Sequence, residues 1–495
     1  MVWVTNKVEP VTKLPTGIAG LDHIALGGLP ANRMTLVAGT TGSGKTLFGL
    51  EFLMKGILQF DEPGVFVTFE ESPSDLRKVM AAFDYDIEGN EAAGKWIFID
   101  ATLTSSPQDA VVGDYDFGAL VARIGHAVRS IGAKRVVLDS TGSLFSRFSE
   151  SGHVRFELFR LAGSLRDMGI TSVLTMETSG ESSALSQFGV EEFVADNVVV
   201  LRNTLEEAKR RRTLEILKLR GAAHRSGEWL FTIVAGEGFI VIPISLLGSK
   251  EVASSERVAT GNTEFDRMCG GGYYRDSAII VSGPTGIGKT LIATQFVGAG
   301  VAQGERSLLF SFEESRDQLI RNAASWGLDL EMMECSGNLE IVCEYPEMAS
   351  LEDHFVRMKH VIEQNRPVRL AVDNLTALER VATARGLRDF IIGMTSFVKR
   401  QEITSLFTST TRTLVGGSSI TEDHISSIAD AIVVLRYVEL AGEVRRAVTL
   451  LKMRGSVHDH RVREFSIDGE GMQVGSAFDQ NVGILGWTPG GESMI

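Results

Sequence analysis

Two short glycine-rich segments of this 495-residue chain have the residue types and spacing of phosphate-binding loops. They read GTTGSGKT and GPTGIGKT. In such loops the glycines let backbone N–H groups face an anion, the lysine neutralises the outer phosphates, and the last threonine hydroxyl can ligate Mg²⁺. We therefore expect ATP to be bound by Gly39, Thr40, Thr41, Gly42, Ser43, Gly44, Lys45 and Thr46, and by Gly283, Pro284, Thr285, Gly286, Ile287, Gly288, Lys289 and Thr290.

Carboxylates follow each loop at matching places. About 25 residues after each loop an apolar run ends in two glutamates, and a later apolar run ends in an aspartate. These residues are Glu70-Glu71 and Asp139 in the first half, and Glu313-Glu314 and Asp373 in the second. The aspartates suit a metal-supporting role beside the loop threonines, and the glutamates are candidates for the base that activates the attacking group. An isolated pair would more often be a solvated strand end, but the recurrence favours a functional role.

The elements that carry these residues also recur. Each loop follows a β-like run (MTLVA or AIIVS) and opens a helical pattern, and the apolar strands alternate with amphipathic helices. This alternation predicts an α/β fold in two tandem P-loop NTPase domains, each a mostly parallel sheet flanked by helices. We place the first domain at 1–247, a linker at 248–256, the second domain at 257–475 and a flexible tail at 476–495.

Composition limits the class of protein. No apolar stretch reaches the length of a membrane span, the start lacks a signal-peptide pattern, and the three cysteines have no C-x-x-C spacing. The formal net charge of −14 weighs against tracking along a nucleic acid. We expect a soluble, cytoplasmic protein without a nucleic-acid or membrane partner.

Both halves close with a Lys-x-Arg-Gly segment, Lys218–Gly221 and Lys452–Gly455. One interpretation is a charged strand edge, to which we give about even odds. The other is an arginine finger that reaches the nucleotide of a neighbouring subunit, where it adds positive charge to a phosphoryl-transfer site. The second interpretation predicts a ring, because a finger acting between subunits needs a neighbour.

The halves differ just before the strand-like runs VVVL and IVVL. Aligning Asp196 with Asp430 places three hydroxyl residues of the second half opposite residues that have none, and the second-half residues are Thr421, Ser426 and Ser427. A hydroxyl near the γ-phosphate can accept it. Two serines before a strand are more often turn residues. The asymmetry favours phosphoacceptors, so that only the second half would phosphorylate itself.

At this point the chain resembles the KaiC family, the double-domain RecA-like ATPases and autokinases of the cyanobacterial clock. The resemblance covers nearly all of the chain and includes EESRDQLIRNAASWG from Glu313, CGGGYYRDS from Cys269 and SITEDHISSIAD from Ser419. It implies a homohexamer of two stacked rings, with ATP and Mg²⁺ bound between subunits. The first ring would be a slow ATPase and the second an autokinase and autophosphatase, acting as a clock-like or signalling regulator.

The resemblance also implies roles for individual residues. Glu70 and Glu71 would supply the hydrolytic base, and Glu313 and Glu314 the kinase base. Trp326 would lie near the second nucleotide. Residues reaching the adjacent subunit would be Lys218, Leu219, Arg220, His224, Arg388, Lys452, Met453, Arg454, Ser456 and His458.

Partners follow from the same resemblance. The segment Val111–Leu120 matches the region linked with KaiB, so we expect a KaiB-like partner. The tail Asn481–Ile495 matches poorly where the family binds KaiA, which argues against dependence on KaiA. The acceptor pair is Ser-Ser where the clock protein has Ser-Thr, and His460 replaces a lysine.

Two other functions are compatible with the P-loops. A RecA-type DNA-dependent ATPase would need basic loops after Asp139, and Ser140–Ser151 contains only Arg147 as a basic residue. A hydrolysis-only signalling scaffold would use the serines merely as turn residues. Mapping label from γ-labelled ATP separates these possibilities.

Overall fold

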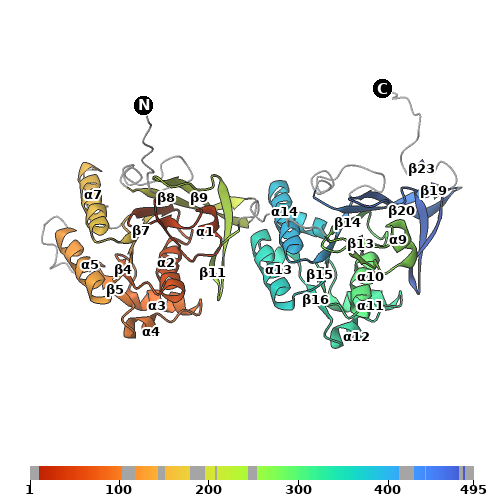
Figure 1. Ribbon diagram of the computed structural model, residues 1–495, viewed down its shortest axis with the longest axis horizontal. Coiled ribbons are helices and arrows are strands. Elements are labelled where there is room, and N and C mark those ends of the chain that lie inside the picture. The colour runs from red at the N-terminus through yellow and green to blue at the C-terminus, as the bar shows by residue number, and fades with distance from the viewer. Residues whose placement is uncertain are drawn as a thin grey trace, which may run out of the picture. The chain divides into compact units, whose positions relative to one another are not determined.

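The structure is a computed structural model, and it describes residues 11–102, 117–142, 151–178, 195–206, 209–242, 254–411, 428–440, 442–478 and 483–484. The chain divides into two compact units, Met1–Pro243 and Ile244–Ile495 (Figure 1). Each unit contains a mostly parallel sheet flanked by helices. The prediction of two tandem RecA-like domains is therefore confirmed.

The first unit begins with a small ribbon and continues with alternating strands and helices. Its elements are β1 (Lys13–Leu14), α1 (Leu21–Ile24), β2 (Leu29–Pro30), β3 (Met34–Gly39), α2 (Lys45–Phe60), β4 (Gly64–Thr68), α3 (Pro73–Ala81), α4 (Ile87–Ala92), β5 (Trp96–Asp100), α5 (Phe117–Ile131), β6 (Arg135–Asp139), α7 (Ser151–Asp167), β7 (Thr171–Glu177), β8 (Asn197–Glu206), β9 (Lys209–Leu219), β10 (Glu228–Val234) and β11 (Gly238–Ile242).

The second unit repeats this order. Its elements are β12 (Arg257–Val258), α9 (Thr263–Met268), β13 (Tyr273–Tyr274), β14 (Ala278–Gly283), α10 (Lys289–Ala302), β15 (Ser307–Ser311), α11 (Arg316–Ala324), α12 (Leu330–Cys335), β16 (Leu339–Cys343), η2 (Pro346–Met348), α13 (Leu351–Asn365), β17 (Arg369–Asp373), η3 (Leu375–Arg380), α14 (Ala384–Arg400), β18 (Thr404–Thr410), β19 (Ala431–Leu440), β20 (Glu443–Met453), β21 (Arg463–Asp468), β22 (Gly471–Ala477) and β23 (Gly483–Ile484).

The two main sheets have the same strand order. The described strands of the first sheet run β11-β10-β9-β8-β3-β7-β6-β4-β5, and those of the second run β22-β21-β20-β19-β14-β18-β17-β15-β16, with β23 beside β19. In the first sheet the strands from β8 to β5 are parallel, and in the second so are those from β19 to β16. The remaining strands extend each sheet in antiparallel fashion. The P-loop strands β3 and β14 lie at the centre, so the carboxyl ends of several strands surround each loop.

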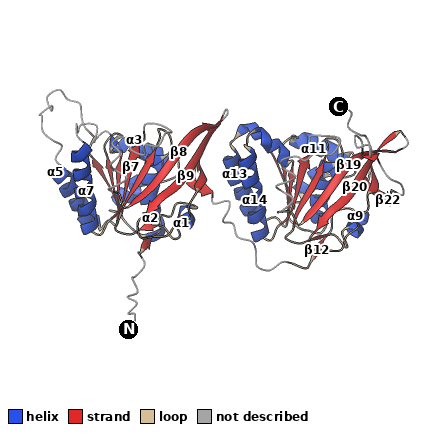
Figure 2. Ribbon diagram, turned by 90° about the horizontal axis from the view of Figure 1, so that it is seen from above, coloured by secondary structure: helices blue, strands red, loops and turns tan. Residues whose placement is uncertain are grey.

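Helices cover both faces of each sheet (Figure 2). In the first unit, Leu120 and Ile124 of α5 pack with Leu158 and Leu161 of α7 against one face of the sheet. Helix α2 contacts β4, β6 and β7. Because both faces are covered, strands such as β3 and β4 are buried at every position, as continuous apolar runs predict.

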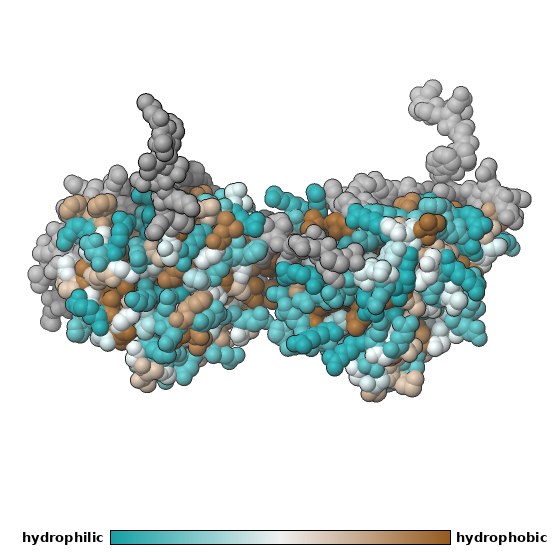
Figure 3. Space-filling model, in the orientation of Figure 1, coloured by the Kyte–Doolittle hydropathy of each residue, from teal (hydrophilic) through white to brown (hydrophobic). Residues whose placement is uncertain are grey.

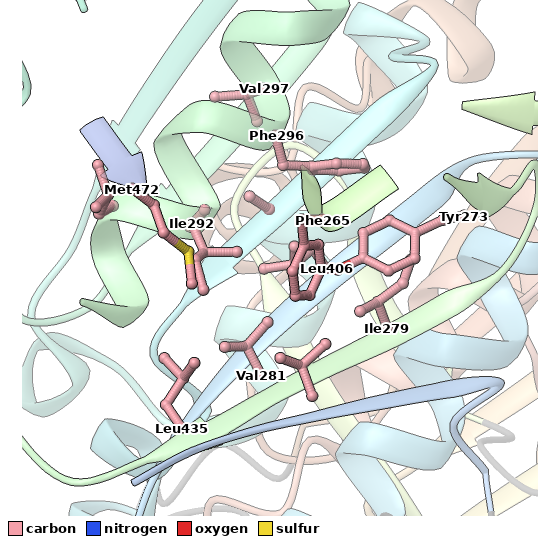
Figure 4. Close-up of a cluster of buried hydrophobic side chains, with 14 of the residues drawn as sticks. Phe265, Tyr273, Ile279, Val281, Ile292, Phe296, Val297, Leu406, Leu435 and Met472 are labelled. Atoms are coloured by element: carbon pink, nitrogen blue, oxygen red, sulfur yellow. The ribbon is translucent and has the colours of Figure 1, made fainter. Parts of the chain in front are cut away.

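The second unit contains an equivalent core around α10 and the first strands of its sheet. The ring of Tyr273 lies edge-on to those of Phe265 and Phe296, and Ile279 and Val281 of β14 lie beside them (Figure 4). Interdigitated side chains of this kind fix the start of α10 relative to β14. The P-loop between these two elements is therefore held on a rigid support.

Local capping explains where several helices begin. Ser315 and Gln318 form a capping box at the start of α11, and Ser350 and Asp353 form another at α13. In the first unit Ser72 caps α3 and is followed by Pro73 at the first helical position. These side chains satisfy N–H groups that have no partner within the helix.

A buried arginine occurs at the same place in both units. Arg135 and Arg369 begin β6 and β17, and both are fully buried. Arg135 pairs with Glu62 and donates to the Phe52 carbonyl, and Arg369 pairs with Glu305 and donates to the Phe296 carbonyl. Each arginine therefore ties the end of the P-loop helix to a central strand.

The surface is mixed in character. On the face drawn in Figure 3, hydrophilic and hydrophobic residues are interspersed over both units. Helix α7 presents Phe156 and Phe159, which are 59% and 70% exposed. Two large apolar side chains one helical turn apart make α7 a candidate contact surface.

Candidate functional site

The two P-loops have matching backbone geometry. Gly44 and Gly288 precede α2 and α10 in the left-handed conformation, with φ of 93° and 118°. A Cβ atom on Gly44 would lie 2.9 Å from Ile233, and one on Gly288 would lie 2.9 Å from Ile467. Only glycine fits these positions without strain, so the sequence motif has a direct steric reason.

The loop lysines lie over their own loops. The Lys45 Nζ donates to the Thr40 carbonyl at 2.9 Å, and the Lys289 Nζ donates to the Gly283 and Pro284 carbonyls at 3.0 Å. Burial lowers the pKa of both lysines, while nearby carboxylates, including Asp139 and Asp373, act in the opposite direction. Both ammonium groups are thus positioned at the loops where phosphates are expected.

The loop threonines lie in hydrogen-bond contact with the strand-end aspartates. The Thr46 Oγ1 donates to Asp139 at 2.9 Å, and the Thr290 Oγ1 donates to Asp373 at 2.7 Å. In each aspartate the other carboxylate oxygen accepts from a threonine one strand away, Thr175 or Thr408. A hydroxyl and a carboxylate side by side fit the oxygen ligands that Mg²⁺ prefers.

Burial raises the pKa of Asp139 to about 6, and the two threonine hydroxyls act in the opposite direction. A bound dication would favour the ionised form of this carboxylate.

The paired glutamates of the first domain follow β4. Burial raises the pKa of Glu71, and Glu70 and Asp75 raise it further. Within the described ranges no hydrogen-bond donor reaches the carboxylate of Glu70 or Glu71. The Thr68 hydroxyl donates instead to the Glu71 backbone carbonyl at 2.6 Å.

Each glutamate of the second domain accepts a hydrogen bond from an asparagine amide. The Asn374 Nδ2 donates to Glu313 at 2.7 Å, and the Asn322 Nδ2 donates to Glu314 at 2.9 Å. Burial raises the pKa of Glu314, and the bond from Asn322 lowers it. Sequence reasoning missed both asparagines. The available signal was that Asn374 directly follows Asp373, where Ser140 follows Asp139.

The Lys-x-Arg segments lie at the ends of β9 and β20. Arg220 is 3.6 Å from Asp196, and Arg454 is 3.6 Å from Asp430. The two arginine side chains are 59% and 52% exposed. The Lys218 Nζ donates to the Ala195 carbonyl at 2.9 Å. Burial lowers the pKa of Lys452, as does the neighbouring Arg454.

The other residues expected at a subunit boundary have varied surroundings. Leu219 and Met453 are buried. Ser456 accepts from Arg257 at 2.6 Å, and the ring of His458 lies 4.1 Å from that of His460. His224 is half-buried, and Arg388 is exposed on α14. Their contacts with a second subunit stay predictions.

Trp326 lies just after α11 and packs against the second core cluster. Its carbonyl lies near the turn between β21 and β22, beside Gly471. Its contact with a nucleotide stays a prediction.

The predicted phosphoacceptors Thr421, Ser426 and Ser427 lie outside the described residues, as do their first-half counterparts. The same holds for 111–116 of the segment linked with KaiB, for the predicted linker up to residue 253 and for most of the tail. Asp430, three residues after Ser427, is described.

Asp430 and the P-loop lie at opposite ends of β14. Ala278, the first residue of this strand, donates its N–H to the Asp430 carboxylate at 2.9 Å, and the P-loop begins at its last residue, Gly283. Five residue steps of about 3.3 Å separate these ends by about 17 Å. Arg454 also lies at the Asp430 end, because its N–H donates to the Asp430 carbonyl at 2.8 Å.

The fold and the two P-loops define a P-loop NTPase with a duplicated RecA-like domain. A family model described as the KaiC ATPase matches residues 14–245 and again residues 258–478. The chain therefore belongs to the KaiC family, as its resemblance to that family predicted, and it is an ATPase of that family.

Curated relatives span nearly the whole chain. The "Circadian clock protein KaiC3" of Synechocystis sp. is 54% identical over 486 residues, which are 98% of this chain and 96% of the relative. The "Circadian clock oscillator protein KaiC" of Thermosynechococcus vestitus is 47% identical over 97% of this chain and 92% of its own length. The protein of the same name from Synechococcus elongatus is 47% identical with the same coverage.

Two features are absent from the described part of the chain. In that part every helix is too short or too polar to cross a lipid bilayer. In the same residues no group of three or more histidine, cysteine, aspartate or glutamate side chains is arranged to hold a metal ion.

Proposed function

We propose that this chain forms an ATP-driven homohexamer whose second domain phosphorylates Ser426 and Ser427 with ATP bound by a neighbouring subunit. The first domain hydrolyses ATP and thereby biases the conformation of the ring. The observation that carries this proposal is the separation of the P-loop from Asp430 and Arg454, which lie at opposite ends of β14.

This separation argues for transfer between subunits. Ser427 is three residues from Asp430, a distance that the chain spans with at most about 11 Å. The P-loop of the same domain begins about 17 Å from Asp430, on the far side of the strand. Asp430 and Arg454 therefore lie together at the end of the sheet away from their own nucleotide loop.

A repeated contact between different surfaces closes into a ring when its rotation permits. Here the P-loop end of one domain would meet the Arg454 end of the next, and the first domain carries the same arrangement with Arg220. The exposed Phe156 and Phe159 on α7 offer apolar area for such a contact. Six copies is the number that the family resemblance implies.

The residues have separable roles in the reaction. Lys289 and the backbone of its loop bind the phosphates, and Thr290 with Asp373 would hold Mg²⁺. The metal ion would neutralise charge on the phosphates. Arg454 from the adjacent subunit adds positive charge where it develops. The Glu313 carboxylate accepts the proton from the serine hydroxyl as it attacks the γ-phosphorus, and ADP leaves.

The biological role follows from the relatives, which are named circadian clock proteins. We propose a clock-like or signalling regulator that reports its phosphorylation and nucleotide state to a KaiB-like partner. Charge-changing modification of a segment at a subunit boundary is a common way to shift such an assembly.

The test is label transfer from γ-labelled ATP followed by phosphosite mapping. We expect label on Ser426 or Ser427, and none on these sites after Lys289→Ala. Lys45→Ala should retain the label but lose most of the phosphate release, by about 100-fold or more at the first site. Undiminished labelling of a Ser426→Ala/Ser427→Ala double variant would contradict the assignment of the acceptors.

Transfer between subunits has its own test. Arg454→Ala and Lys289→Ala proteins are mixed, so that one supplies intact P-loops and the other intact arginines. Recovery of label in the mixture, with little in either protein alone, supports a composite pocket. A monomer at saturating Mg·ATP with full activity would contradict it. Mass measurement with and without nucleotide gives the number of copies.

A further inference from the structure

We propose that Asn374 is a positioning residue of the second domain that holds the Glu313 carboxylate oriented for proton transfer. Ser140, its counterpart in the first domain, cannot reproduce this arrangement. The inference rests on the proposed function insofar as Glu313 is taken as the base. It concerns the control of that base, which neither the sequence motifs nor the family match assigns.

Both the oxygen and the nitrogen of the Asn374 side-chain amide form hydrogen bonds. Its Oδ1 accepts from the Ala377 N–H at 3.1 Å and so caps η3, while its Nδ2 donates to Glu313 at 2.7 Å and to the Thr410 hydroxyl at 3.1 Å. Only 2% of Asn374 is exposed. The Ala377 bond requires an acceptor, which places the two amide hydrogens toward Glu313 and Thr410.

The orientation of this amide has a geometric consequence. Its N–H donor lies 2.7 Å from the Glu313 carboxylate and so restricts the direction in which that carboxylate points. Glu313 itself is exposed, so in solvent alone its side chain would sample several rotamers. The bond from a buried partner therefore fixes the direction of the base.

The first domain provides an internal comparison. The backbone around the two positions is equivalent, since Phe69 donates its N–H to the Asp139 carbonyl and Phe312 donates its N–H to the Asp373 carbonyl, both at 2.8 Å. Ser140 then occupies the place of Asn374. Serine is one bond shorter and carries a single hydrogen, so it cannot donate to a glutamate and to a neighbouring hydroxyl at the same time.

The strand that pairs with each P-loop strand, β18 or β7, also differs between the domains. Gly283 pairs with Thr410 in the second sheet, whereas Gly39 pairs with Glu177 in the first. Thr410 supports Asn374, while Glu177 accepts from Thr41 of the P-loop. The network around the base is therefore specific to the domain that is proposed to phosphorylate a serine.

The experiment compares Asn374→Ser and Asn374→Asp in the full-length chain. Initial rates of label transfer are measured together with KM for ATP. For Asn374→Ser we expect kcat to fall about 10-fold while KM stays within about twofold, because the change affects the base and not the phosphate cradle. Asn365→Ser, on α13 away from the site, is the matched control and should leave both constants unchanged.

Asn374→Asp separates positioning from a merely structural role. Aspartate retains an oxygen that can accept from Ala377, but it places a second carboxylate against Glu313. The second carboxylate repels Glu313 and donates no hydrogen bond to it, so kcat should fall further than in Asn374→Ser while KM for ATP stays within about twofold. A structural defect would instead change KM for ATP together with kcat.

The second readout is phosphate release. It is measured in a Lys45→Ala background, because the nucleotide site of the second domain then supplies the released phosphate. If the parent protein gives no label, the autokinase proposal fails, and the Asn374 inference is judged from kcat and KM of phosphate release. If the kcat values of both Asn374 variants coincide with those of the parent protein, the inference is wrong.

Discussion

The two domains are alike where they would contact phosphate and metal, and they differ around the attacking group. Both have a lysine over its own loop and an aspartate held between two threonines, with threonine–aspartate distances of 2.9 and 2.7 Å. By contrast, the glutamates accept amide hydrogen bonds only from Asn374 and Asn322 of the second domain, among the described residues. Duplication thus retained the nucleotide cradle and allowed the surroundings of the base to diverge.

The helix that follows the P-loop shows a second difference. Glu51 of α2 is fully buried and accepts from the Phe239 N–H at 2.8 Å, and Gln295 occupies the equivalent position of α10. Both side chains lie against a glycine in the last hairpin, Gly238 or Gly471. The first domain therefore couples its P-loop helix to its hairpin through an ionisable group, and the second uses a neutral amide.

The largest expected effect concerns the buried arginine that both domains share. Arg135→Ala and Arg369→Ala should each lower the free energy of unfolding of their own domain by about 3–5 kcal/mol, because each breaks an ion pair of a buried arginine and leaves buried carbonyls without its N–H donors. Denaturant unfolding followed by domain-specific proteolysis measures this. Arg160→Ala removes a more exposed ion pair and should cost less than about 1 kcal/mol. Markedly unequal losses in the two domains would break the equivalence of the halves.

The second-largest expected effect concerns the difference between Glu51 of the first domain and Gln295 of the second. Burial raises its pKa from 4.5 to about 7, while the Phe239 N–H and Lys55 act in the opposite direction and Tyr85 lies close by. Because the folded-state pKa is raised, this carboxyl does not lower the free energy of unfolding below about pH 4.5. That free energy falls as the pH rises from about 4.5 to about 7. Glu51→Gln should therefore stabilise the first domain by roughly 2–3 kcal/mol at pH 8 and by little at pH 4.5.

Thermal unfolding of Glu51→Gln at several pH values provides the measurement, and the exposed Glu88→Gln is its control. The reciprocal change, Gln295→Glu, should give the second domain the pH dependence that the first domain loses. A gain for Glu51→Gln that is constant from pH 4.5 to 8 would show that the amide packs better and that ionisation is not the cause.

The smallest effect concerns helix caps. Ser72→Ala and Ser315→Ala should each cost about 1 kcal/mol, since each hydroxyl satisfies an N–H group at a helix start. Pro73 restricts the unfolded chain near Ser72, and Gln318 completes a capping box with Ser315. Equal losses measured by denaturant unfolding would indicate that the caps act alike despite these different neighbours.

The sequence predicted the fold well because its signals are local and repeated. Apolar runs before Gly39 and Gly283, glycines at fixed spacing and a helical pattern afterwards define the strand–loop–helix unit wherever it occurs. The α/β class and two RecA-like domains followed from these signals and from the family resemblance. The buried Arg135 and Arg369 were not predicted, because a lone arginine at a strand start has no sequence pattern that distinguishes burial from exposure.

For this protein, residue spacing alone determined the duplicated P-loops and the carboxylates that belong to them, since the steric demands of a phosphate loop act within a few residues. Only the tertiary structure decided which polar groups touch those carboxylates. Asn374 is next to Asp373 in the chain but reaches Glu313, 61 residues away, across two paired strands. Parallel pairing sets such contacts at a sheet edge, and no local pattern encodes them.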